Sequence, residues 1–185
     1  MTDLKTHPKF QAGTWKLDPT HSEITFQVRH LAISKVRGSF EKFDVEVVVA
    51  ESGEATIEAT VDVSSVNTNQ EARDNHLRSS DFFLVDEHPT ITFSAKGDDI
   101  VFDGDDFTIN GQLTLRGVTK PVTLKGEFGG VITDDYGRTK AGVSATTKIN
   151  RHDFGVSWNA ALEAGGFTLG DDVTISIDIQ VDLQK

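Results

Sequence analysis

The stretch VTISIDIQVDL, residues 173–183, decides the fold. Every second residue from Val173 to Leu183 is apolar, and the residues between them are polar. Successive side chains of a β-strand point to opposite faces, so this pattern predicts a strand with one buried and one solvated face. The same alternation recurs at residues 24–30, 43–49, 55–63, 91–95, 107–115, 122–128 and 141–149.

So many strands must either pair as two sheets or close on themselves, because almost no helix is available to cover them. The one helical excursion is expected around residues 69–86, where Thr68 and Glu71 fit a capping box. No repeat or linker divides the chain. We expect a tail over residues 1–12 and a single domain over residues 13–185.

Composition excludes several functions. The formal net charge is -11, from 18 basic and 29 acidic residues, and such a field repels nucleic acid. The absence of cysteine excludes disulfides and thiolate chemistry. Residues 1–11 lack the apolar core of a secretory signal, so a cytoplasmic location is expected. The apolar run at residues 47–50 is far too short for a membrane span, so we do not expect an integral membrane protein.

A series of ordered motifs, which together extend over residues 13–183, resembles the YceI-like polyisoprenoid-binding family. The motifs are DPTHS at 18–22, VRH at 28–30, SKVRGSF at 34–40, RDNHLRSSDFF at 73–83, PTITF at 89–93, GQLTLRGVTKPV at 111–122, INRHDFG at 149–155, WN at 158–159 and GD at 170–171.

The resemblance implies an all-β, eight-stranded antiparallel, lipocalin-like barrel. It also implies an elongated apolar tunnel that holds a polyprenyl chain, so the domain would be a non-catalytic carrier. The ligand would be an isoprenoid lipid, such as a polyprenyl phosphate or a quinone, or another long-chain amphiphile. No other cofactor is expected, and a homodimer is possible. An eight-stranded barrel can instead be filled by its own side chains, and the sequence leaves that choice open.

Most candidates for the tunnel wall lie at inward-facing strand positions; ordinary core packing is the alternative for them. The wall candidates are Phe26, Val28, Phe40, Phe93, Ile109, Leu113, Val143 and Ile177. Phe82 is placed to gate one mouth, and Phe154 with Trp158 forms a second lid candidate; a simple plug of the barrel end is the alternative.

Polar candidates concern the head group of the ligand. His30 shares the inward parity of its strand and could donate a hydrogen bond, although a structural histidine is the alternative. Arg29, Arg37 and Arg78 could meet a phosphate. For these cations, and for Arg151, the alternative is a solvated surface.

A second hypothesis is a small hydrolase or isomerase that uses an inward-facing histidine. No known catalytic motif or metal-ligand spacing is present, so we assign no catalytic residue and no metal site.

Overall fold

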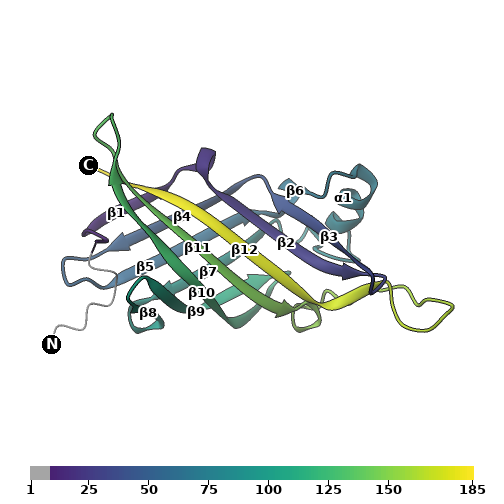
Figure 1. Cartoon of the computed structure of the whole chain (residues 1–185). Coiled ribbons are helices and arrows are strands. Elements are labelled where there is room, and N and C mark those ends of the chain that lie inside the picture. Colours follow the sequence, from purple (N-terminus) through teal and green to yellow (C-terminus); the bar gives the residue numbers. More distant parts are fainter. Residues whose placement is uncertain (1–8) are drawn as a thin grey trace.

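The structure is a closed barrel built almost entirely from β-strands (Figure 1). It is a computed structural model that describes residues 9–185, so residues 1–8 of the predicted tail lie outside the described residues. The strands are β1 (Gly13–Leu17), β2 (Glu23–His30), β3 (Ser34–Phe40), β4 (Phe43–Val49), β5 (Ala55–Asp62), β6 (Val66–Asn67), β7 (Thr90–Lys96), β8 (Ile100–Asp103), β9 (Asp106–Leu115), β10 (Val118–Thr133), β11 (Thr139–Asn150) and β12 (Leu169–Leu183). The helices are α1 (Glu71–Arg78) and the short 3-10 turns η1 (Pro19–His21), η2 (Val63–Ser65), η3 (Gly97–Asp99) and η4 (Arg151–Phe154).

The predicted eight-stranded antiparallel barrel is confirmed. Its ring runs β1-β4-β5-β7-β9-β10-β11-β12, and β1 pairs with β12 to close it, with Trp15 opposite Leu183. Strand β12 pairs twice: its last residues pair with β1, and its earlier residues pair with β2. Strands β2, β3 and β6 therefore extend the sheet beyond the ring at the end that carries α1, which we call the helix end. The C-terminus lies at the opposite end (Figure 1).

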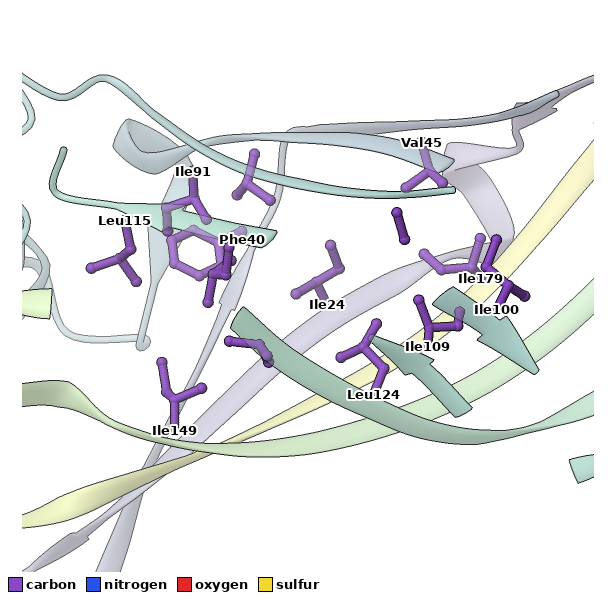
Figure 2. Packing of buried hydrophobic residues seen from close by; sticks show 14 of the residues in the cluster. Ile24, Phe40, Val45, Ile91, Ile100, Ile109, Leu115, Leu124, Ile149 and Ile179 are labelled. Carbon is purple, nitrogen blue, oxygen red and sulfur yellow. The ribbon is translucent and has the colours of Figure 1, made fainter. Parts of the chain in front are cut away.

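The apolar face of every ring strand points inward, as the alternation predicts. Figure 2 shows buried side chains that approach one another from different strands of the wall. The labelled residues all belong to one cluster of buried side chains: Ile24, Phe40, Val45, Ile91, Ile100, Ile109, Leu115, Leu124, Ile149 and Ile179.

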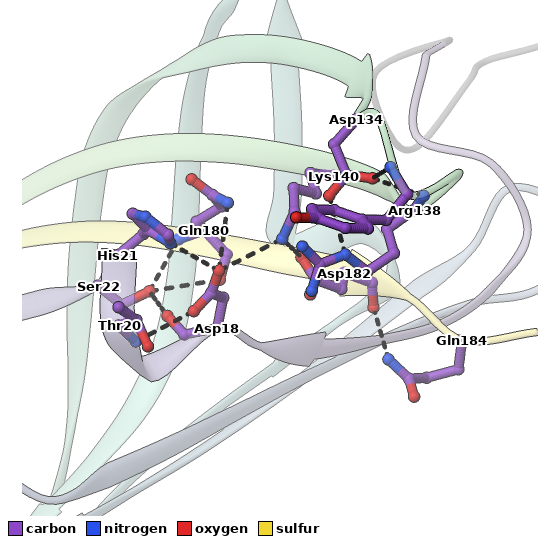
Figure 3. A network of polar contacts seen from close by, with 11 residues as sticks. Asp18, Thr20, His21, Ser22, Asp134, Arg138, Lys140, Gln180, Asp182 and Gln184 are labelled. Atoms are coloured by element: carbon purple, nitrogen blue, oxygen red, sulfur yellow. Dashed lines mark hydrogen bonds and ion pairs between the residues drawn. The ribbon is translucent and has the colours of Figure 1, made fainter.

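The DPTHS motif forms the break between β1 and β2, which run in the same direction along β12, and a network of polar contacts holds this break (Figure 3). Asp18 accepts hydrogen bonds from the Thr20 amide and from Lys140 Nζ. Ser22 Oγ donates to the Asp18 carbonyl and accepts from the Gln180 amide of β12. We call this network, which also includes Asp182, the seam. It joins the two parts of the first strand to the strands beside it.

The helical excursion is confirmed, but the predicted capping box is wrong. Gln70, not Thr68, caps α1, and its side chain accepts from the Arg73 amide. Asn69 has a positive φ of 62°, which turns the chain between Thr68 and the helix. Thr68 instead donates its amide and its hydroxyl to Asp74, a buried carboxylate on α1, and so fastens the helix to the end of β6.

Candidate ligand-binding cavity

The barrel is hollow. A cavity of about 450 Å³ lies inside it, within the range of pockets that hold small organic ligands. The wall is almost entirely hydrocarbon, because the inward positions of the ring strands carry Val, Ile, Leu, Phe and Ala. Small side chains such as Ala59 and Ala145 leave space in the lumen that larger residues would occupy.

The structure places all the predicted wall, lid and inward histidine residues on this cavity. They are Phe26, Val28, His30, Phe40, Phe82, Phe93, Ile109, Leu113, Val143, Phe154, Trp158 and Ile177. The inward orientation of those that lie on strands agrees with the strand parity. That they contact a ligand stays a prediction.

Two glycines, which the sequence analysis did not single out, hold aromatic rings close to the wall. A methyl group on Gly38 would come within 2.5 Å of Phe26 Cζ, and one on Gly111 within 2.2 Å of Phe93 Cζ. Each ring therefore covers bare backbone that a side chain would otherwise occupy. This close approach keeps the rings beside the strands and leaves more of the lumen open.

An aromatic cluster lies toward the C-terminal end of the barrel. The ring of Phe10 lies 4.5 Å from the Trp15 ring and 5.8 Å from the Phe128 ring, centroid to centroid. Phe10 also lines the cavity, together with Phe102. The lining at this end is apolar.

The helix end is more polar, because α1 presents Arg73, His76 and Leu77 to the cavity. These positions are three and four residues apart and so share one face of the helix. His76 Nε2 lies 2.8 Å from Asp81 Oδ2. The imidazole meets the Trp158 ring edge-on, with centroids 4.8 Å apart. The Phe82 ring lies 5.4 Å from the Trp158 ring, centroid to centroid, so the two predicted lid segments touch across the barrel end.

Arg116, which sequence reasoning missed, joins the two lid segments. Its Nη1 donates to the Gly155 carbonyl at 2.7 Å, and its Nη2 donates to the Ser80 carbonyl at 2.9 Å. Gly155 follows Phe154 and Ser80 precedes Phe82 by two residues, so one guanidinium fastens both lids. The predicted turn between β9 and β10 was the sequence signal that could have placed Arg116 at this end of the barrel.

The predicted head-group arginines do not line the cavity. Arg29 and Arg37 are exposed on the outer face of β2 and β3. Arg78 donates to the carbonyls of Ser64 and Val66, which holds α1 against the chain before it. Among the described residues, Arg73 and Arg151 are the arginines that line the cavity, and no aspartate or glutamate does.

Arg151 is 4% exposed and begins η4, directly after β11. Its Nε donates to the Gly170 carbonyl, and its Nη1 donates to the carbonyls of Val156 and Trp158, each at 2.8 Å. Its Nη2 has no hydrogen-bond partner among the described residues. Burial lowers the pKa of Arg151 below its ordinary value, although the charge of Asp171 acts in the opposite direction.

No metal site or membrane-spanning helix is found in the described part of the chain. Residues 9–185 contain no group of three or more histidine or acidic side chains placed to hold a metal ion. None of their helices has the length and hydrophobicity that a bilayer crossing requires.

The fold and the cavity together define a lipocalin-like barrel with an apolar internal cavity. Residues 15–181 match the YceI-like domain, which covers most of the chain. The protein therefore belongs to the YceI-like family, as its motifs suggested.

Relatives and solved structures agree with this assignment. A UPF0312 protein of Staphylococcus aureus strain MSSA476 is 40% identical over 171 residues, which cover 91% of this chain and 96% of the relative. The crystal structure of a Campylobacter jejuni YceI protein is 31% identical, with a TM-score of 0.70, over 85% of this chain and 90% of that one. A structure described as a polyisoprenoid binding domain from Saccharophagus degradans shares the fold, with a TM-score of 0.68 at 16% identity, over 92% of this chain and 98% of that one.

Proposed function

We propose that the protein is a non-catalytic carrier that holds an isoprenoid lipid in its barrel. The observation that supports this most directly is the hollow interior, whose wall is predominantly apolar. The family assignment supports it, as does the fold shared with the polyisoprenoid binding domain of Saccharophagus degradans.

The chemistry of such a ligand fits the wall. A prenyl chain offers neither charge nor hydrogen bonds, so its binding depends on removing hydrocarbon from water. Each buried carbon unit contributes about 0.8 kcal/mol, so one five-carbon unit gains roughly 4 kcal/mol before ordering costs. The shape of the cavity, set by residues such as Ala59 and Phe93, would then decide which tails fit.

The test is to extract the purified protein under denaturing conditions and identify the released compound by mass spectrometry. We expect a hydrophobic ligand near one per chain. Ala59→Phe should displace it, because the new ring occupies the lumen from within the wall of β5. Thr60→Phe is the matched control, since Thr60 is the next residue of the same strand and is exposed. A native protein without ligand, or an Ala59→Phe variant that retains it in full, would contradict the carrier function.

The alternative, a hydrolase or isomerase, relies on an inward histidine. His30 does line the cavity, but no side-chain hydrogen bond joins it to a carboxylate among the described residues. His76 has such a partner in Asp81, and this pair is the one observation that favours catalysis. Turnover of an added lipid ester that His76→Ala or His30→Ala abolishes would support this alternative. The cytoplasmic location and a homodimer stay predictions.

A further inference from the structure

Arg151 carries hydrogen-bonding capacity that the described protein does not use. A guanidinium has five N–H donors, and three of those of Arg151 are directed to the carbonyls of Gly170, Val156 and Trp158. Both donors of Nη2 lack an acceptor in the described chain, and the group is buried. Buried polar groups are nearly always satisfied, so this one calls for a partner other than the described residues.

The charge of Arg151 is also left without a close counter-ion. Its three acceptors are neutral carbonyls, which orient the guanidinium but do not cancel its charge. The carboxylate that acts on it from nearby, Asp171, is exposed and accepts from His152 at 2.8 Å instead. A buried cation in this setting is costly to the folded protein unless an anion compensates it.

Acidic side chains are also missing from the described lining of the cavity. Its titratable lining groups are Arg73, Arg151, His30 and His76, all of them basic. This concentration of basic groups is opposite in sign to the net charge of -11 of the chain. Arg151 donates to the Trp158 carbonyl, and the Trp158 ring contacts His76, so these groups lie together at the helix end.

We propose that Arg151 Nη2 binds an oxyanion head group, a carboxylate or a phosphate ester, of a lipid whose tail extends toward the aromatic cluster at the C-terminal end. This inference rests on the proposed carrier function and adds the orientation and head-group class of the ligand. The three carbonyls hold the guanidinium in place before the ligand arrives, so little ordering is needed on binding. Arg73 of α1 lines the same cavity and adds a second positive charge.

The test compares three ligands that share a farnesyl tail: farnesol, farnesoic acid and farnesyl phosphate. Their dissociation constants with the native protein are measured by isothermal titration calorimetry. A charge-assisted hydrogen bond predicts that at least one of the two acids binds about 10- to 100-fold more tightly than the alcohol. Whether the carboxylate or the phosphate shows the larger gain identifies the head group.

Arg151→Met should reduce the affinity for the preferred acid to that for farnesol and leave farnesol binding unchanged. Arg37→Met is the matched control: it removes the same charge from the exposed outer wall and should preserve the preference. If Arg151→Met does not fold, Arg151→Lys keeps the charge with a single donor centre, and the comparison of ligands on the native protein still decides.

The outcomes separate the two proposals. Equal binding of all three ligands by the native protein overturns the head-group inference and leaves the carrier function intact. The head-group inference is also overturned if Arg151→Met weakens the binding of acid and alcohol alike. If none of the three farnesyl ligands binds, the carrier function itself fails for this tail.

Discussion

Lys140 and Arg151 are two buried cations at opposite ends of the same strand, β11, and their surroundings differ completely. Lys140 is 7% exposed, and its Nζ binds Asp182 at 2.7 Å and Asp18 at 3.3 Å. Arg151 is 4% exposed, and its hydrogen-bond partners within residues 9–185 are all carbonyls. The hydrogen bond to Asp182 raises the pKa of Lys140 overall, whereas burial lowers the pKa of Arg151. The chain compensates one cation with its own carboxylates, whereas the other lines the cavity without a carboxylate partner among the described residues, so we assign the first to the fold and propose the second for ligand binding.

The largest expected effect comes from removing the compensated cation. Lys140→Met should lower the free energy of unfolding by about 3 kcal/mol, because two partly buried carboxylates lose their common partner. Ligand affinity should not change, since the seam lies away from the cavity lining. Urea unfolding and calorimetric titration measure the two quantities.

Lys148→Met is the matched control, because Lys148 is an exposed residue of the same strand. It should change the unfolding free energy by less than about 0.5 kcal/mol. The distinction between Lys140 and Arg151 would fail if the two variants lost the same unfolding free energy. It would also fail if Lys140→Met lost ligand binding.

The strand interiors were predictable from sequence, and the charges at the helix end were not. In a closed barrel, each strand side chain points either into the lumen or out to solvent, and the alternation assigns wall residues such as Phe93 and Val143 to the lumen. The alternation of inward and outward side chains applies only within a strand, and Arg151 is the first residue after β11. Its orientation depends on the carbonyls of residues 156, 158 and 170, which the sequence does not place.

The helix shows the same limit. The sequence predicted α1, but which of its basic residues faces the cavity depends on how the helix docks. Arg73 lines the cavity, while Arg78, one of the three predicted head-group arginines, donates to the carbonyls of Ser64 and Val66. The shifted cap at Gln70 has the same origin, because Thr68 is held by Asp74 through a contact that forms only once the helix is in place.

A smaller effect is expected at the lids. Arg116→Gln should lower the free energy of unfolding by about 1 kcal/mol, because two hydrogen bonds to carbonyls near the surface are lost. Ligand dissociation should become several-fold faster, since Phe82 and Phe154 are no longer joined through Arg116. Stopped-flow displacement of a bound fluorescent fatty acid measures the rate.

Arg138→Gln serves as the control for the lids, because Arg138 is an exposed arginine bound to Asp134 in the turn between β10 and β11. It should leave the dissociation rate unchanged. An Arg116→Gln variant with the native dissociation rate would mean that ligand exchange does not use the helix end.

The smallest effect is expected from pH in the neutral range. Burial acts to raise the pKa of Asp18, but hydrogen bonds from His21, Lys140 and the Thr20 amide lower it overall, below the ordinary 3.8. Its contribution to stability is therefore complete above pH 3.8 and is lost as the pH falls through the lower folded-state value.

The pKa of Lys140 is raised above 10.5, so its contribution is complete below that pH and is lost as the pH rises through the higher folded-state value. The difference in unfolding free energy between the native protein and Lys140→Met should thus stay constant from about pH 5 to 9 and shrink outside that range. Urea unfolding of both proteins across this range measures the difference. If the difference already changes steeply near pH 7, the ion pairs of Lys140 with Asp18 and Asp182 are not its source.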